Sequence, residues 1–235
     1  MLELLAFGDT GWLDELLLGA LGTLALLLVS FPIGLALGIC LAYVKFAREP
    51  TLRIWGNLVT SVLRGVPELI TLLIIYFYGQ RLLNAATGTL GWQRMEISAY
   101  GCGVAALSMV LTAYASEVFL GSLRAMGPSS IEAAKALGLG RFVTLRFVVL
   151  PELMRLSEPG LSNLWLALLK RTALVSTISF TELLKQSQTA AHSSGHYLWF
   201  YGIACLGYIM LGRLTYPVFR YWIGHHRFKA YAKAI

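Results

Sequence analysis

The feature that most constrains this chain is the run from Leu16 to Val44, which is 29 residues long and contains no charged side chain. An α-helix needs about 20 mostly apolar residues to cross the hydrocarbon core of a bilayer. Because that core offers no water, backbone N–H and C=O groups must be paired within the protein, and a helix pairs them within one segment. Hydrophobic residues make up 57% of the 235 residues, and the mean hydropathy is +0.68. The sequence therefore predicts an all-α membrane protein rather than a soluble domain.

Four further stretches are long and apolar enough to cross a membrane. Ile97–Leu123 is interrupted only by Glu117, and three others contain more polar residues: Ile54–Gln80, Leu161–Leu184 and Tyr197–Phe219. We therefore predict a polytopic protein with five transmembrane helices. No intervening segment is long enough for a soluble domain, so we expect residues 1–235 to form a single transmembrane domain.

The distribution of basic residues predicts the orientation of these spans. Cytoplasmic loops are enriched in Lys and Arg, and the first 15 residues carry four acidic side chains and no basic one. If the N-terminus lies outside and the C-terminus in the cytoplasm, three basic residues fall outside: Arg81, Arg94 and Lys185. Twelve of the 19 then fall on the inner side: Lys45, Arg48, Arg53, Arg124, Lys135, Arg141, Arg146, Arg155, Arg220, Arg227, Lys229 and Lys233. The net charge of +7 thus belongs to inner loops in contact with membrane lipid, and no nucleic-acid partner is predicted.

Neither a metal site nor a catalytic site is predicted. The three cysteines, Cys40, Cys102 and Cys205, fall within apolar spans, and their spacing matches no metal-ligand pattern. No nucleophile and base occur at a shared membrane depth.

Charged residues within the second predicted span mark a candidate pathway, since a charge at membrane depth costs at least ~2.5–3.5 kcal/mol on insertion scales. Arg64 and Glu68 are four residues apart, so a continuous helix would place them on one face. Pro67 removes a backbone donor and disfavours helix at Val66, which predicts a break there. The half-helix that opens at Pro67 would offer free N–H groups to a substrate carboxylate. The alternative is a structural Arg64–Glu68 pair that only kinks the span.

The other intramembrane charges lie in the third and fourth predicted spans. Lys170 and Arg171 interrupt the fourth, so that segment must line water, protein or a second subunit. Glu117 lies near the inner end of the third span, where it could gate an exit or pair with Arg124 or Lys170. Glu182 lies towards the outer end of the fourth, where a solvated helix end is the alternative to a substrate contact.

The longest polar insertion, residues 124–160, predicts a folded cytoplasmic loop. Its sequence favours two short helices, Ile131–Leu137 and Arg141–Leu150, which are separated by glycines and end before Pro151. The apolar side of the first helix could enter a groove on a partner protein. The alternative is an amphipathic helix resting on the lipid surface.

This loop resembles the EAA loop of bacterial ABC-importer permeases in Glu132-Ala133-Ala134, Gly138 and Val148-x-Leu150-Pro151. Three other segments are similar to motifs of polar amino acid permeases. They are Arg64-Gly65-x-Pro67, Ala113–Phe119 and the Leu-Lys-x-Thr-x-Leu stretch at Leu169–Leu174. Together the four motifs cover most of residues 16–220 and resemble the histidine/lysine/arginine/ornithine permease family, HisQ-like subunit.

The resemblance implies a type I ABC importer permease fold in the bacterial inner membrane, which imports basic or other polar amino acids, or opine-like compounds. It implies three partners: an ATPase dimer that binds ATP and Mg²⁺, a second related permease subunit in a heterodimer, and a periplasmic substrate-binding protein. No phosphate-binding loop occurs in this chain, so it is expected to be a transport subunit without a cofactor of its own. The residues implied in ATPase coupling are Glu132, Ala133, Ala134, Gly138 and Arg141. The substrate-pathway candidates are Arg64, Glu68, Glu117, Lys170, Arg171, Thr172 and Glu182.

The chain departs from the family pattern at Arg171, where the family often has Asp or Ser, and at Pro128, where it often has Gln. Arg171 adds a cation near the predicted pathway, which favours a substrate with a carboxylate over a purely cationic one. Two other function classes remain. An ion-driven secondary transporter would explain the broken spans and buried charges but not the EAA spacing. The other class is a membrane scaffold or enzyme, and no nucleophile–base pair or metal cluster at a shared membrane depth supports catalysis.

Overall fold

The computed structural model describes residues 2–8, 11–89, 96–127 and 129–232, and every regular element within them is helical. Arg94, Pro128 and Lys233, each singled out above, lie outside the described residues. The elements in chain order are η1 (Leu2–Leu5), α1 (Leu13–Phe46), α2 (Pro50–Gly65), α3 (Glu68–Thr89), α4 (Ala99–Ala125), α5 (Ser129–Ala136), α6 (Arg141–Thr144), the π-helical turn η2 (Leu145–Val149), α7 (Leu150–Arg171), the 3₁₀ helix η3 (Thr172–Ile178), α8 (Leu183–Ser194) and α9 (Tyr197–Ala232). The all-α prediction is confirmed for the described residues.

Helices α1 and α4 form the centre of the fold, and small residues let them approach closely. A Cβ added at Gly34 would lie 2.8 Å from the Leu111 Cβ, and one at Gly38 would lie 2.7 Å from the Ala115 Cβ. The Ser108 hydroxyl donates to the Ser30 carbonyl oxygen across the same interface. The two most hydrophobic of the three single candidate spans thus pack on each other by small-residue contacts, as is common between membrane helices.

Helix α9 packs on this centre through an aromatic cluster. The Trp165 ring of α7 stacks on Phe219 of α9, with centroids 4.4 Å apart, and Phe31 of α1 meets both rings edge-on. Such aromatic pairs add about 0.5–1.5 kcal/mol beyond the area that they bury. The cluster joins the first and last long helices near the middle of the molecule.

Three single helices of the described chain are long and apolar enough to cross a membrane, namely α1, α4 and the Tyr197–Tyr221 part of α9. The segments Pro50–Gly65 and Glu68–Arg81 meet the same criteria together and would make a fourth span, although they are bent by 99° relative to each other. The break predicted at Val66–Pro67 is therefore present. The predicted number of five spans rests on α7, which is 22 residues long but carries charges at both ends.

The predicted fourth span, Leu161–Leu184, is wrong as a continuous helix. Helix α7 begins eleven residues earlier, at Leu150, and ends at Arg171. The chain then continues as the 3₁₀ helix η3 and turns at Ser179, whose φ of 63° lies in the left-handed region. Helix α8 begins at Leu183. Composition could not reveal this end, because Thr172–Ile178 is as apolar as the helix before it.

The second predicted loop helix, Arg141–Leu150, is also wrong in where it stops. Helix α6, the π-helical turn and α7 follow one another without interruption past Pro151. Pro151 lies at the first turn of α7, where a missing N–H costs little. The wider π turn before it pairs the Leu150 N–H with the Leu145 carbonyl oxygen. The loop is thereby joined to α7 as one helical arm.

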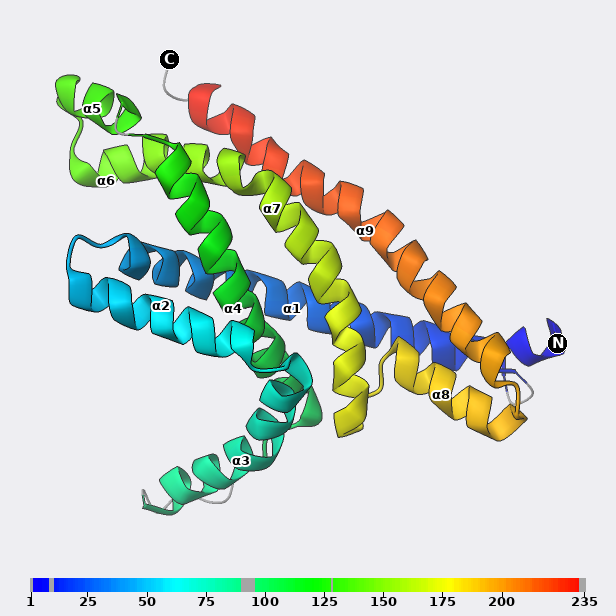
Figure 1. Cartoon of the computed structure of the whole chain (residues 1–235). Coiled ribbons are helices and arrows are strands. Elements are labelled where there is room, and N and C mark those ends of the chain that lie inside the picture. The colour runs from blue at the N-terminus through cyan, green and yellow to red at the C-terminus, as the bar shows by residue number, and fades with distance from the viewer. Residues whose placement is uncertain (1, 9–10, 90–95, 128, 233–235) are drawn as a thin grey trace.

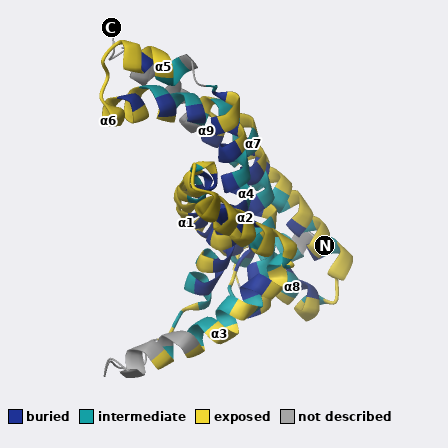
Figure 2. Ribbon diagram, turned by 60° about the vertical axis from the view of Figure 1, so that its left-hand side comes forward, coloured by how far each residue is buried: buried dark blue, intermediate teal, exposed yellow. Residues whose placement is uncertain are grey.

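The ends of the molecule are arranged as Figure 1 shows. The N-terminus and α8 lie at one end, whereas α5, α6 and the C-terminus lie at the other. This arrangement fits a chain whose two termini lie on opposite sides of a membrane, and the N-outside orientation stays a prediction. In Figure 2, buried residues follow the helices in the middle of the molecule, and α5 and α6 are largely exposed.

Candidate functional site

An ion pair with a buried lysine joins the C-terminal end of α1 to α4. The Lys45 Nζ lies 2.6 Å from the Glu117 Oε1, and only 1% of the lysine side chain is exposed. The Nζ also donates to the Thr60 Oγ1 (3.2 Å) and the Ser116 Oγ (3.4 Å). The charge pattern predicted that Lys45 is a cation in an inner loop. This prediction is wrong, because Lys45 is buried at the end of α1. Removing one partner of such a buried pair leaves an uncompensated charge, so the pair ties α1, α2 and α4 together.

Glu117 also faces a second cation on α2. The Arg64 Nη1 lies 3.6 Å from the same Oε1, and the two side chains are 46% and 40% exposed. The predicted partners of Glu117, Arg124 and Lys170, are wrong, because Lys45 and Arg64 take their place. Since exposed charge is costly against lipid, this face must meet water or protein.

A second ion pair links α3 to α7. The Arg171 Nη2 lies 2.8 Å from the Glu68 Oε1. The Tyr114 ring of α4 connects this pair to the first, since the Arg171 Cζ lies 4.5 Å and the Arg64 Cζ 5.3 Å from the ring centroid. Guanidinium groups at such distances are attracted to the ring.

We call these six residues the charge network: Lys45, Arg64, Glu68, Tyr114, Glu117 and Arg171. They come from α1, α2, α3, α4 and α7, so that all five helices meet at one polar site. Three of the members are cations and two are carboxylates, so the network carries a net charge of +1 when all are ionised. It includes four of the sequence candidates, and the pairings suggested for them, Arg64 with Glu68 and Glu117 with Arg124 or Lys170, are absent among the described residues.

The predicted Arg64–Glu68 pair is wrong for a geometric reason. Residues four apart face each other only while the helix continues, and here the chain bends by 99° between them. Arg64 therefore points to α4, and Glu68, the first residue of α3, points to α7. Lys45 and Tyr114 were missed as network members. Only the position of Tyr114 in a family-like motif could have drawn attention to it.

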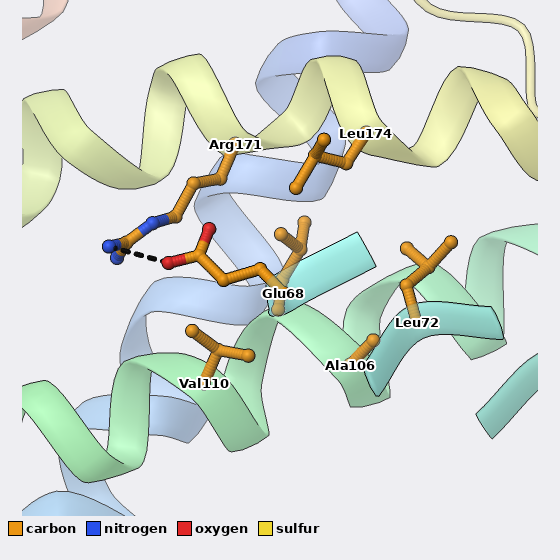
Figure 3. A pocket seen from close by; sticks show the side chains of 7 residues that line it. Glu68, Leu72, Ala106, Val110, Arg171 and Leu174 are labelled. Carbon is orange, nitrogen blue, oxygen red and sulfur yellow. Dashed lines mark ion pairs between the residues drawn. The ribbon is translucent and has the colours of Figure 1, made fainter. Parts of the chain in front are cut away.

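A small hollow lies beside the Arg171–Glu68 pair (Figure 3). Its walls are the two charged side chains and five apolar ones: Leu72, Ala106, Leu107, Val110 and Leu174. The space inside has room for little more than a water molecule. In this conformation the ion pair forms the polar wall of the hollow.

The remaining pathway candidates lie apart from the hollow. Lys170 is exposed beside Arg171. Thr172, the first residue of η3, is fully buried, and its hydroxyl donates to the Leu169 carbonyl oxygen in the last turn of α7. This bond leaves the Thr172 hydroxyl occupied with the backbone.

Glu182 is fully buried, so the interpretation as a solvated helix end is wrong. Its carboxylate accepts hydrogen bonds from the Lys185 N–H (2.8 Å), from the Thr23 hydroxyl of α1 (3.3 Å) and from the Tyr208 hydroxyl of α9 (2.5 Å). Glu182 thus caps α8 and anchors it to two long helices. Gly22 permits the close approach, because a Cβ there would lie 2.4 Å from the Thr181 carbonyl oxygen.

The second candidate region is the loop at the opposite end from α8, which we call the helical knob (residues 129–149). Gly138 has φ +71° and follows the last turn of α5. Its N–H bonds to the Lys135 carbonyl oxygen, and the Leu139 N–H bonds to that of Ala134, which is the Schellman pattern of a helix end. Only glycine adopts this backbone readily, so Gly138 sets the angle between α5 and α6.

The knob exposes four of its five family-type residues, Glu132, Ala133, Gly138 and Arg141, and buries Ala134 against the rest of the chain. Its two most exposed large apolar side chains are Leu137 and Phe142, which are 78% and 73% exposed. The first loop helix was predicted to bind a partner through one apolar side, formed by Ile131, Ala134 and Leu137. These three side chains do not all face the same way. Ile131 and Ala134 pack inward, and Leu137 faces outward with Phe142, which the sequence analysis missed.

Comparison with known families gives one match over most of the chain. Residues 34–227 match the family described as binding-protein-dependent transport system inner membrane component. Among curated proteins, the nopaline transport system permease protein NocQ of Agrobacterium fabrum is 36% identical over 216 residues, covering 91% of this chain and 92% of that protein. The arginine ABC transporter permease protein ArtQ of Haemophilus influenzae is 36% identical and covers 84% of this chain and 87% of its own. The histidine/lysine/arginine/ornithine permease protein HisQ of Salmonella typhimurium is 31% identical over 92% of this chain and 97% of its own.

Solved structures show the same likeness. A crystal structure of an amino acid ABC transporter with histidines superposes with a TM-score of 0.72 at 27% identity, over 91% of this chain and 94% of that chain. The inward-facing MetNI methionine ABC transporter superposes with a TM-score of 0.68 at 15% identity, over 90% and 97% of the two chains. The second likeness concerns the fold alone.

Proposed function

The chain belongs to the family of binding-protein-dependent transport system inner membrane components, and from this premise we propose that it carries polar amino acids or opine-like compounds into the bacterial cytoplasm. In this proposal it is one permease subunit of an ATP-driven importer with the type I fold. Basic amino acids are the first candidates, in keeping with the arginine and histidine/lysine/arginine/ornithine permeases among its relatives. Nopaline and octopine permeases among those relatives support opine-like compounds as the second candidate class.

The helical knob is the observation that carries the proposal. A surface with two exposed large apolar side chains next to exposed Arg141 is suited to a groove on a partner protein. The proposed partner protein is an ATPase dimer that binds ATP and Mg²⁺. In the proposed complex, each permease subunit inserts one knob into one ATPase subunit.

The helical arm from α6 to α7 offers a route for the motion. Because α6, the π turn and α7 are continuous, displacement of the knob would move α7 as well. Arg171 lies at the other end of α7, in the charge network. Closure of the ATPase pair on ATP binding would therefore move the knob, and the helical arm would transmit this motion to Arg171 in the charge network. The charge network would then have one arrangement before closure and another after it, and the two would differ in their affinity for the substrate.

The proposed pathway runs along the half-exposed face of the charge network, where Arg64, Glu68, Glu117 and Arg171 gather. This face needs water or a second subunit, which supports a pathway between two related permease subunits in a heterodimer. Lys170 is exposed next to it. The internal bonds of Thr172 and Glu182 fit a structural role within the subunit. A periplasmic binding protein would deliver the substrate at the end that holds α8.

The main competing function is an ion-driven secondary transporter, which a buried charge network would also suit. It assigns no role to an exposed apolar knob at the end of a continuous arm. Uptake that survives the loss of ATP but collapses with the proton gradient would favour it.

The direct test is uptake by proteoliposomes that contain the full complex, with ATP inside and the binding protein outside. Glu132→Lys and Gly138→Asp are expected to leave the amount of inserted protein unchanged and to abolish ATP-dependent uptake. Gly140→Ala is the matched control, because Gly140 has an ordinary φ of −64° and an open surrounding. Normal uptake by either knob variant, at equal protein, would refute the coupling role. A screen of cationic, neutral and acidic amino acids in the same vesicles would identify the substrate.

A further inference from the structure

The hollow beside the Arg171–Glu68 pair has an unusual polar wall. Apart from these two side chains, the residues that line it are apolar. Figure 3 shows the Arg171 and Glu68 side chains reaching towards each other from α7 and α3. An arginine and a carboxylate therefore face each other in apolar surroundings, where electrostatic interactions are stronger than in water.

Arg171 uses only part of its hydrogen-bonding capacity. Its Nη2 is 2.8 Å from Glu68, and its guanidinium group lies over the Tyr114 ring. Its Nη1 is buried and has no hydrogen-bond partner among the described residues. A guanidinium group presents its donors as a rigid fork that matches both oxygens of a carboxylate. The unused donor therefore calls for a further acceptor, and a carboxylate is the group of that shape.

The charge of the network points the same way. Its three cations face two carboxylates, which leaves one positive charge uncompensated when the site holds no ligand. Uncompensated charge at membrane depth is costly. The carboxylate group of a ligand would compensate this charge locally, whereas a purely cationic ligand would add to it.

The small size of the hollow requires Glu68 to move before such a ligand can bind. There is room for little more than a water molecule while Glu68 contacts Arg171. Glu68 is the first residue after the 99° bend, so a change in the bend would carry its carboxylate away from Arg171. Glu68 thus occupies the place that an incoming carboxylate would take.

We infer that Arg171 binds the carboxylate of the transported solute and that Glu68 is an internal carboxylate that holds this place until the solute displaces it. The inference rests on the proposed function and adds to it the chemical group that is recognised. It concerns a position at which this chain departs from the pattern of its family. The ligand class is a small amino acid or amino acid derivative with a free carboxylate.

The two residues then have effects of opposite sign on binding. Arg171→Ser removes the anchor and weakens carboxylate binding. Glu68→Gln removes the competing charge and strengthens it. If the pair were only a structural tie between α3 and α7, both substitutions would act in the same direction.

The experiment measures equilibrium binding to the purified permease–ATPase complex in detergent, without nucleotide and without the binding protein, whose own selectivity would otherwise dominate. The probes are two pairs that differ only in the carboxylate: L-arginine with agmatine, and L-histidine with histamine. We expect the wild-type complex to bind at least one amino acid about tenfold more tightly than its amine, the amount that a hydrogen-bonded charge contributes. Arg171→Ser should abolish this difference by raising the Kd of the amino acid, and Glu68→Gln should lower that Kd severalfold.

Two further variants control for folding and charge. Arg171→Lys keeps the positive charge but loses the planar set of guanidinium donors that matches both oxygens of a carboxylate, so about threefold weaker binding is expected. Arg213→Ser removes an exposed arginine from α9, away from the network, and should leave every Kd unchanged. Equal binding of amino acid and amine by the wild type, or equal loss with Arg171→Ser and Glu68→Gln, would overturn the inference. Either result would leave the proposed function standing if Glu132→Lys still abolishes ATP-dependent uptake.

Discussion

The helical knob and the charge network use their side chains in opposite ways. The knob is built from about 20 consecutive residues and turns Leu137 and Phe142 outward, away from the rest of the chain. The network draws its members from five helices and turns Lys45 inward, with 1% of the side chain exposed. Large apolar side chains that are exposed to water mark a contact with another protein. A buried charge and its partner mainly affect the stability of the subunit itself. The comparison therefore predicts that damage to the knob stops transport by intact protein, and that damage to the Lys45–Glu117 pair of the network destabilises the protein.

The largest expected effect concerns the network. Glu117→Gln leaves the buried Lys45 without its counter-ion, which should cost about 3–5 kcal/mol of unfolding free energy. The measurement is the thermal unfolding midpoint of the complex in detergent, together with the yield of folded protein.

The control for this prediction is the double variant Lys45→Met/Glu117→Gln. It removes both charges, so it should recover most of the lost stability. If Glu117→Gln unfolds at the wild-type temperature, the ion pair does not tie the helices together and the contrast between the two regions fails.

Phe142→Asp tests the knob. It should leave the unfolding temperature unchanged, because the side chain is 73% exposed. Loss of a central aromatic contact with a partner typically costs 2 kcal/mol or more, so ATP-dependent uptake should fall about 30-fold. Phe142→Leu keeps an apolar contact and should retain most of the activity. Loss of stability in Phe142→Asp would mean that this surface packs within the subunit.

Gly138→Ala sharpens the comparison within the knob. A Cβ at φ +71° costs roughly 1–2 kcal/mol, and nothing within 4 Å would clash with it, so the strain is confined to the backbone. We expect uptake to fall about fivefold at unchanged protein level. Gly140→Ala, two residues on, should have no effect on uptake. An equal response of the two glycines would show that the backbone angle at Gly138 is not what positions the knob.

The smallest effect is expected at Arg220, which pairs with Glu158 between α9 and α7 at 2.9 Å. The arginine side chain is 63% exposed, and pairs of this kind contribute about 1 kcal/mol or less. Arg220→Gln should therefore lower the unfolding midpoint by no more than a few degrees. A loss as large as that of Glu117→Gln would show that burial does not separate the two kinds of ion pair.

Much of the fold follows from local patterns in the sequence. The uncharged run at Leu16–Val44 becomes α1, Ile97–Leu123 becomes α4, and Pro67 breaks the second span. Each of these depends on residues close together in the chain. The same holds for Gly138, because the end of a short helix is decided by its own last turn.

The partners of the charged residues could not be predicted in the same way. In a continuous helix, Arg64 and Glu68 would be neighbours on one face. Because the chain bends between them, Arg64 pairs with a residue of α4 and Glu68 with a residue of α7. Lys45 looked like a loop cation, and Glu182 like a solvated helix end. Both are buried because helices distant in the sequence close over them.

The sequence by itself therefore determined that this chain is helical, lies in the membrane and presents an EAA-type knob, since helix formation and membrane partition depend on nearby residues. Only the tertiary structure decided which cation meets which carboxylate and where the chain leaves α7 for α8. An ion pair forms only when two side chains come within about 4 Å. For Arg171 and Glu68, that distance is set by the packing of both α3 and α7 on α4.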